Sequence, residues 1–196
     1  MFHFSSPDAN TVEHFLARQR QHKFTYCHQG KTATTPPSGF QVDHTRVKLG
    51  HGIEAFRQAK EALGKWQQFD LGWVSAKPHQ TAIREGETVC IVGKAVGMYW
   101  MNACRIVYVI DDTLHTPRFG FAYGTLPAHL KAGEERFLVE MDSNGDVWYD
   151  ILAFSRNKRW MVWLIHPYMR KLQKQFGRDS AARMKQLVAD KLQHAA

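Results

Sequence analysis

A succession of short strand-like segments followed by one long helix limits the fold of this chain more than any other feature. From residue 69 to residue 155, apolar and β-branched residues gather in short segments that polar or glycine-containing connections separate. Short connections place consecutive strands side by side and antiparallel. The strands are predicted at residues 69–75, 88–94, 103–111, 119–125, 136–141 and 147–155. Asn144-Gly145 between the last two favours a tight hairpin turn, because this pair accepts positive φ angles.

Helical periodicity surrounds this run of strands. A strand expected at residues 40–49 leads into a helix at residues 53–66, where Ile53, Phe56, Leu63 and Trp66 recur at helical spacing. From Pro167 a single helix is predicted to continue to about residue 193. The fold class is therefore α+β: a curved antiparallel sheet of about six to seven strands gripping a long C-terminal helix.

The first part of the chain has a different character. Ser6-Pro7-Asp8 predicts a helix start with Pro7 at the first helical position, and a short helix follows. Residues 28–39 contain two prolines and two glycines, which is typical of a loop. Residues 1–38 are therefore expected to be a helical arm and loop, and residues 39–196 a single globular domain.

The C-terminal helix has two opposed faces at 100° per residue. The apolar face contains Met169, Leu172, Phe176, Ser180 and Leu187. The opposite face is basic and contains Arg170, Lys171, Lys174, Arg178 and Lys185. Such a basic face is either a solvated surface or a contact for anionic lipid or an acidic partner. The stretch Trp160–Ile165 before the helix fits core packing, the lip of an apolar cavity or an interfacial membrane anchor.

Composition excludes several classes of protein. The net charge is +8, but the cations are dispersed and no zinc-finger or RNA-recognition signature occurs, so a nucleic-acid partner is not expected. No apolar run approaches the ~18–20 residues of a membrane span. The three cysteines lack CxxC spacing, and the histidines lack HxH or HExxH spacing. We expect a soluble cytoplasmic protein without a metal or another cofactor.

Three blocks of the sequence resemble the uncharacterised protein family 0548, which occurs in plants and bacteria. They are residues 39–73, 119–141 and 145–155, and the most specific motif is GTLPxHxxxGEErF at residues 124–137. The similarity runs from about Phe24 to the C-terminus, although Ser155-Arg156-Asn157 lacks a proline that members commonly carry. The element order resembles the helix-grip layout of START and Bet v 1-like proteins. The resemblance implies a fold and no particular chemistry.

The best candidate site lies between Tyr123 and Arg136. Glycines bracket a predicted loop that carries His129 and ends in Glu134-Glu135-Arg136, and a histidine near a carboxylate is the minimum for acid–base chemistry. Strand alternation places Glu135 on the same face as Phe137. If Phe137 faces the core, Glu135 points inward and needs a partner, for which Arg105 and His129 are available. The alternative is a purely structural ion pair.

Three functional hypotheses follow from these residues. The first is a cavity between sheet and C-terminal helix that binds a small lipid-like or aromatic ligand, with polar or aromatic contacts from Arg105, Tyr108, Tyr123, His129, Glu135, Arg136, Trp148 and Tyr149. The second is a cyclase- or hydrolase-like enzyme in the same cavity, with Glu135 or His129 as the base. The third is peripheral binding to an anionic membrane through the basic helix face. The oligomeric state stays open.

Overall fold

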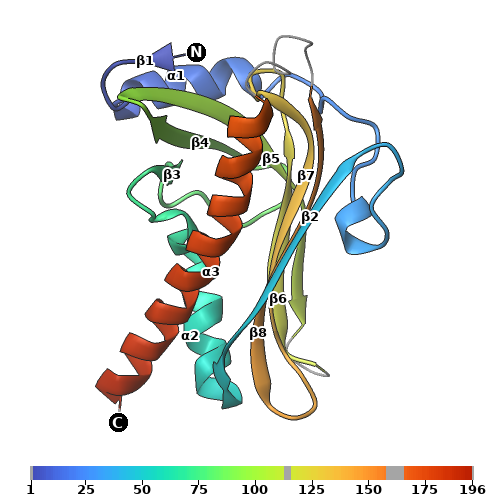
Figure 1. Cartoon of the computed structure of the whole chain (residues 1–196), viewed down its shortest axis with the longest axis vertical. Coiled ribbons are helices and arrows are strands. Elements are labelled where there is room, and N and C mark those ends of the chain that lie inside the picture. Colours follow the sequence, from blue (N-terminus) through green and yellow to red (C-terminus); the bar gives the residue numbers. More distant parts are fainter. Residues whose placement is uncertain (1, 113–115, 158–165, 196) are drawn as a thin grey trace.

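The computed structural model describes residues 2–112, 116–157 and 166–195, and these residues form a curled antiparallel sheet with two helices on its concave face (Figure 1). Along the sheet the strands follow the order β2-β8-β7-β6-β5-β4-β3, and β1 pairs with β5. The strands are β1 (Phe2–His3), β2 (Gln41–His51), β3 (Val74–Lys77), β4 (Thr88–Ala95), β5 (Met98–Asp112), β6 (Arg118–Thr125), β7 (Lys131–Met141) and β8 (Asp146–Asn157). The helices are α1 (Ala9–Gln19), α2 (Gly52–Gly64) and α3 (His166–Ala195), with short 3-10 turns η1 (Lys31–Ala33) and η2 (Gln67–Phe69).

The predicted fold class is confirmed. The sheet is curved and antiparallel, α2 follows the long strand β2, and α3 is a single long helix. The chain also turns between β7 and β8 at the predicted Asn144-Gly145, where Gly145 has a φ of 81° but Asn144 does not have a positive φ. No helix among the described residues is long and apolar enough to cross a membrane.

Several element boundaries differ from the predicted ones. The chain winds through η2 after Trp66, whose φ is 58°, so the strand expected at residues 69–75 is found at Val74–Lys77. The β7 strand begins at Lys131 and not at residue 136, which places Glu134 and Glu135 inside the strand. At the start of the chain, Asp8 caps α1 by accepting a hydrogen bond from the Thr11 backbone N–H, so Pro7 precedes the helix.

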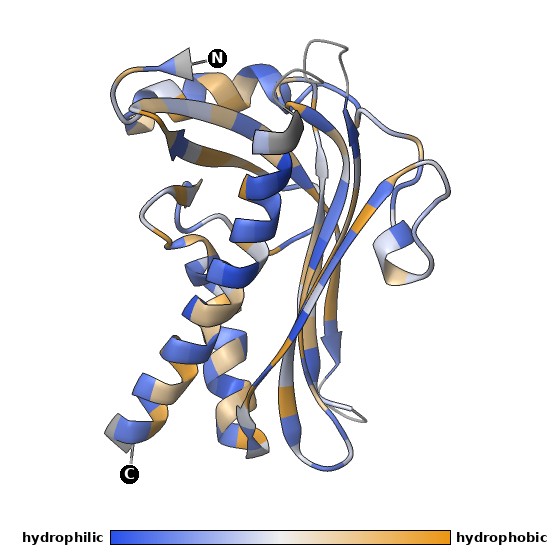
Figure 2. Cartoon of the chain, viewed as in Figure 1, coloured by the Kyte–Doolittle hydropathy of each residue, from blue (hydrophilic) through white to orange (hydrophobic). Residues whose placement is uncertain are grey.

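Aromatic packing between the concave face and the helices forms the main core. Trp66 lies 4.7 Å from Phe121, and Phe69 lies 5.5 Å from Phe137, measured between ring centroids. The second half of α3 supplies Met184 and Val188, which are fully buried. In Figure 2 the first turns of α3 are mainly hydrophilic, whereas apolar residues recur along its second half. The second half of α3 therefore anchors the helix in the core, and its first half lies over the site described below.

The convex face of the sheet is tied to the chain between α1 and β2. The buried Glu134 carboxylate accepts hydrogen bonds from the Tyr26 hydroxyl at 2.8 Å and the Gly30 backbone N–H at 2.8 Å. It also accepts bonds from the Thr32 backbone N–H at 3.0 Å and the Thr32 hydroxyl at 2.6 Å. A Cβ atom on Gly124 would lie 2.1 Å from the Tyr26 hydroxyl oxygen, so only glycine leaves room for this contact. One carboxylate thus fixes the path of the N-terminal segment.

Candidate functional site: a cavity between the sheet and the C-terminal helix

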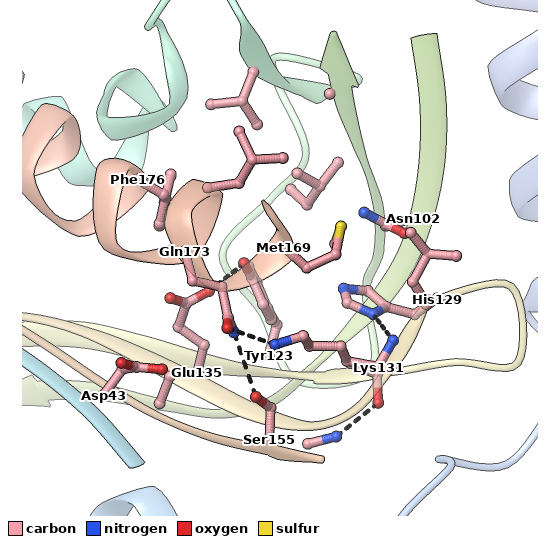
Figure 3. A pocket seen from close by; sticks show the side chains of 18 of the residues that line it. Asp43, Asn102, Tyr123, His129, Lys131, Glu135, Ser155, Met169, Gln173 and Phe176 are labelled. Atoms are coloured by element: carbon pink, nitrogen blue, oxygen red, sulfur yellow. Dashed lines mark hydrogen bonds between the residues drawn. The ribbon is translucent and has the colours of Figure 1, made fainter. Parts of the chain in front are cut away.

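A cavity of about 170 Å³ lies between the concave face of the sheet and the first half of α3 (Figure 3). Its walls are mostly apolar and come from both ends of the curled sheet, from η2 and from α3. The apolar lining includes Phe69, Trp73, Ile91, Trp100, Leu130, Met169, Leu172 and Phe176. The polar side chains that reach it include Asn102, Tyr123, His129, Lys131, Glu135 and Gln173. A largely apolar hollow with a few convergent polar groups is typical of a small-molecule site.

Glu135 and Tyr123 form the polar centre of this cavity. The two residues are opposite each other on β7 and β6, and the Tyr123 hydroxyl donates a hydrogen bond of 2.6 Å to the Glu135 carboxylate. Burial raises the pKa of Glu135 to about 7, although the bond from Tyr123 opposes the shift. Burial also raises the pKa of Tyr123 well above its usual value. The cavity therefore contains a carboxyl group that gains and loses its proton near neutral pH.

A second polar group connects the sheet to α3. The Lys131 ammonium donates a hydrogen bond to the Gln173 side-chain oxygen, and the Gln173 amide donates one of 3.3 Å to the Ser155 hydroxyl. Lys131 is only 4% exposed, and burial lowers the pKa of this side chain to about 8. These bonds hold the first half of α3 over β7 and β8.

Asn102 lies on the cavity wall and carries a buried hydrogen-bond acceptor without a partner among the described residues. This residue lies on β5, it is 9% exposed, and it lines the cavity. Its side-chain oxygen is buried and has no hydrogen-bond partner within the described part of the chain. An unsatisfied buried polar atom costs about 1–3 kcal/mol.

The loop between β6 and β7 brings His129 to the cavity wall. The His129 Nδ1 atom accepts a hydrogen bond of 3.0 Å from the Lys131 backbone N–H, so this nitrogen carries no proton. The hydrogen bond at the Glu135 carboxylate comes from Tyr123, which the sequence did not suggest as the partner. His129 and Glu135 thus line one cavity.

The other predicted ligand-binding residues lie outside the cavity, and most of them hold the N-terminal segment on the convex face. Arg105 donates a hydrogen bond of 2.6 Å to the Arg20 carbonyl oxygen, so it cannot serve as the partner of Glu135. The Tyr108 hydroxyl lies 2.8 Å from the Thr32 hydroxyl. Arg136 donates to the Thr32 carbonyl oxygen at 2.9 Å and to Asp150 at 2.7 Å.

Trp148 and Tyr149 occupy neither the cavity nor the N-terminal contact. The Trp148 indole N–H donates a hydrogen bond of 2.9 Å to Asp142, and the Arg46 guanidinium lies over its ring. Tyr149 is fully buried in the core, where its hydroxyl lies 2.9 Å from that of Ser180. Of the predicted set, Tyr123, His129 and Glu135 are the residues that the fold brings together.

The cations on the basic face of α3 differ in their surroundings. One terminal nitrogen of the Arg170 guanidinium donates hydrogen bonds to both oxygens of the Asp43 carboxylate, so the charge of Arg170 is neutralised. Lys171, Lys174, Arg178 and Lys185 are exposed. The tryptophans of the Trp160–Ile165 stretch lie outside the described residues. Among the described residues there is also no cluster of three or more side chains suited to hold a metal ion.

Sequence comparison places this architecture in a family. The sequence model of a family described as a domain of unknown function, DUF1990, matches residues 25–183. A UPF0548 protein of Dictyostelium discoideum is 34% identical and covers 96% of each chain. The UPF0548 protein At2g17695 of Arabidopsis thaliana is 38% identical over 73% of this chain and 71% of its own length. The chain belongs to the UPF0548 family.

Solved structures similar to this UPF0548 protein share its fold. TTHA0849 from Thermus thermophilus gives a TM-score of 0.54 at 15% identity, covering 77% of this chain and 99% of that one. The di-domain ARO/CYC StfQ from the steffimycin biosynthetic pathway gives a TM-score of 0.52 at 9% identity, covering 78% of this chain and 52% of that one. At these identities the similarity shows a common curled-sheet fold alone.

The GTLPxHxxxGEErF block that marks the UPF0548 resemblance serves both faces of the sheet. A Cβ atom on Gly133 would lie 2.0 Å from the Phe154 carbonyl oxygen, so this glycine allows β7 and β8 to approach closely. Glu134 then faces the N-terminal segment, and Glu135 faces the cavity. The sequence block therefore joins the attachment of the N-terminal segment to the candidate site.

Lys131, Asn102 and Gln173 are the site residues that sequence reasoning missed. Lys131 follows directly after the loop that carries His129, which was a usable signal. Asn102 and Gln173 come from strands and helices far from the GEErF block, and only the closed fold brings them to it. A single polar residue in an apolar strand or on an amphipathic helix does not by itself indicate that it lies near this block in the fold.

Proposed function

We propose that this UPF0548 protein binds a small apolar molecule that carries a hydroxyl or carbonyl group. The cavity between the concave face and α3 is its site. The observation that carries the proposal is an apolar cavity whose wall presents a few polar side chains, the hydrogen-bonded pair Tyr123–Glu135 among them. Such a wall favours an apolar ligand with one polar group of its own.

The size of the cavity supports a ligand with one ring or a short chain. An apolar cavity of about 150 Å³ in another protein admits benzene, and the cavity here is about 170 Å³. Trp73, Trp100 and Phe176 supply flat apolar walls that suit a ring.

Glu135 and Tyr123 would recognise the polar group of the ligand. A carboxyl group with a pKa of about 7 donates a hydrogen bond when protonated and accepts one when ionised. Tyr123 holds this carboxyl group in place from the opposite strand. A hydroxyl group can accept from the protonated form and donate to the ionised form, whereas a carbonyl group can only accept, so the site favours these groups over a purely apolar molecule.

Isothermal titration with 3-phenylpropan-1-ol tests this proposal. The wild type should bind one molecule saturably. Leu172→Trp fills the cavity and should weaken binding at least about tenfold, equivalent to about 1.4 kcal/mol. Gln186→Trp is the matched control, because it adds the same side chain at an exposed position of the same helix, and it should bind like the wild type. Absence of saturable binding to the wild type, or equal affinity in all three proteins, would contradict the proposal.

A second candidate function is proton abstraction in the same cavity. The observation that favours it is a carboxyl group with a pKa near neutral facing a largely apolar cavity, as a general base requires. The fold that the chain shares with the ARO/CYC protein StfQ is compatible with an enzyme but does not select one.

Deuterium exchange into 4-phenylbutan-2-one tests this second candidate without knowledge of the natural substrate. A base at Glu135 would take a proton from the carbon next to the carbonyl group and return a deuteron from heavy water. The wild type should accelerate this exchange, and Glu135→Gln should reduce the acceleration by about 100-fold or more. Exchange at the buffer rate with the wild type would rule out this role and leave the binding proposal intact.

A further inference from the structure

A second, polar hollow lies directly beside the cavity. This groove of about 400 Å³ is formed by β2, β8 and the first half of α3. The groove and the cavity share the wall residues Asp43, Glu135, Ala153, Gln173 and Phe176. A ligand that fills the cavity therefore lies beside the groove, at the wall that these five residues form.

Two cations at the groove have no acidic partner. Lys174 and Arg178 line it, both are exposed, and neither forms an ion pair with any described residue. They are four residues apart on α3, a spacing at which like charges repel on a helix. Some other surface cations form ion pairs, as in Arg46–Glu140 and Lys191–Glu61. The groove thus has a positive charge that the protein itself leaves uncompensated.

The acidic residues of the groove do not cancel this charge. Asp43 is occupied by Arg170, which forms hydrogen bonds to both carboxylate oxygens. Glu135 is about half protonated at pH 7, because burial raises its pKa to about 7. It therefore offsets the two cations only in part, and the groove keeps a net positive charge from Lys174 and Arg178.

We infer that the groove binds the oxyanion, a carboxylate or phosphate, of an amphiphilic ligand whose apolar body occupies the cavity. This inference rests on the proposed function and adds an anionic group to its ligand. Lys174 and Arg178 are the residues that contact the oxyanion, and an arginine and a lysine together suit either group.

Titration calorimetry at low salt with 3-phenylpropanoate and its neutral analogue 3-phenylpropan-1-ol tests this inference. The wild type should bind the acid about tenfold more tightly than the alcohol. Lys174→Gln/Arg178→Gln should lose about that tenfold preference and keep its affinity for the alcohol, because it lacks the charge-assisted contacts to the oxyanion. Lys171→Gln/Lys185→Gln removes the same charge from exposed positions of the same helix outside the groove, and it should retain the preference.

The other possible outcomes show whether the oxyanion site in the groove, the ligand site in the cavity or both are refuted. If the alcohol binds and the acid binds no better, the oxyanion site is refuted and the apolar cavity stands. Equal losses in the two double variants would show bulk attraction and would also refute the site. Acetate or inorganic phosphate binding as tightly as 3-phenylpropanoate would make the groove a free-oxyanion site unconnected to the cavity. If neither aromatic probe binds the wild type, both proposals fail.

Discussion

At the scale of single residues, the neighbours Glu134 and Glu135 show how one strand serves two purposes. Glu134 is 2% exposed and accepts four hydrogen bonds from the N-terminal segment on the convex face. Glu135 faces the cavity and accepts one hydrogen bond, from Tyr123. The difference in the number of donors explains why burial dominates at Glu135 and raises its pKa.

The raised pKa of Glu135 predicts a pH dependence of stability. From about pH 4.5 to about pH 7 the folded state holds a proton that the unfolded state releases, so the free energy of unfolding falls as pH rises through this window. The loss at pH 8 is about 3 kcal/mol at most. Glu135→Gln should remove this contribution in urea denaturation at pH 5 and pH 8. The exposed Glu85→Gln control should not, and an unchanged pH dependence in Glu135→Gln would contradict the assignment.

The same substitution one residue earlier should have the opposite effect at pH 8. Glu134→Gln turns an amide NH₂ group toward hydroxyl and backbone N–H donors, and leaving such buried donors unmatched costs about 1–3 kcal/mol each. We expect a lower melting temperature and faster hydrogen exchange at the Gly30 and Thr32 amides. Wild-type melting with both amides still protected would show that Glu134 does not hold the N-terminal segment.

At the scale of elements, α3 combines an anchored half with a half that covers the site. Met184 and Val188 bury the second half in the core, whereas Leu172 and Phe176 of the first half line the cavity. Gly177 lies between the two halves and allows a close approach to β2, because a Cβ atom there would meet the Thr45 hydroxyl at 2.8 Å. The glycine therefore serves helix–strand packing, and the helix continues through it.

Peripheral contact of α3 with an anionic membrane stays a prediction for this element. Each exposed cation near such a surface contributes about 1 kcal/mol. The wild type should therefore sediment with anionic vesicles at low salt. Lys171→Glu/Lys174→Glu/Arg178→Glu should remain in the supernatant. Equal sedimentation of both proteins, or none for the wild type, would show that these cations are a solvated surface.

At the scale of the whole molecule, hydrophobic periodicity was enough to predict the architecture. Alternation along the strands and helical spacing in α2 and α3 carry that information, and Asn144-Gly145 supplied one turn. Alternation also predicted that Glu135 shares the inward face with Phe137, which packs in the core. The site was only partly predictable, because its residues meet across strands that are far apart in the sequence.

A register shift in β5 explains the observed positions of Arg105 and Tyr108, which were predicted to bind the ligand. The pairing of β5 with β6 shifts register between Ile106 and Tyr108. Without this shift, Arg105 and Tyr108 would lie on opposite faces, whereas both contact the N-terminal segment on the convex face. A bulge of this kind leaves no mark in apolar–polar alternation. The partners of Arg105 and Tyr108 were therefore not readable from sequence.

Amide and indole NMR spectra during titration with 3-phenylpropan-1-ol test the central claim most directly. Trp73 and Trp100 line the cavity, whereas Trp148 bonds to Asp142 away from it. We predict saturable shifts of the Trp73 and Trp100 indole signals and of the Tyr123 and Glu135 amides, with the Trp148 indole unmoved. No shift up to the solubility limit of the alcohol, or a shift of Trp148 as large as those of Trp73 and Trp100, would contradict a ligand site between the sheet and α3.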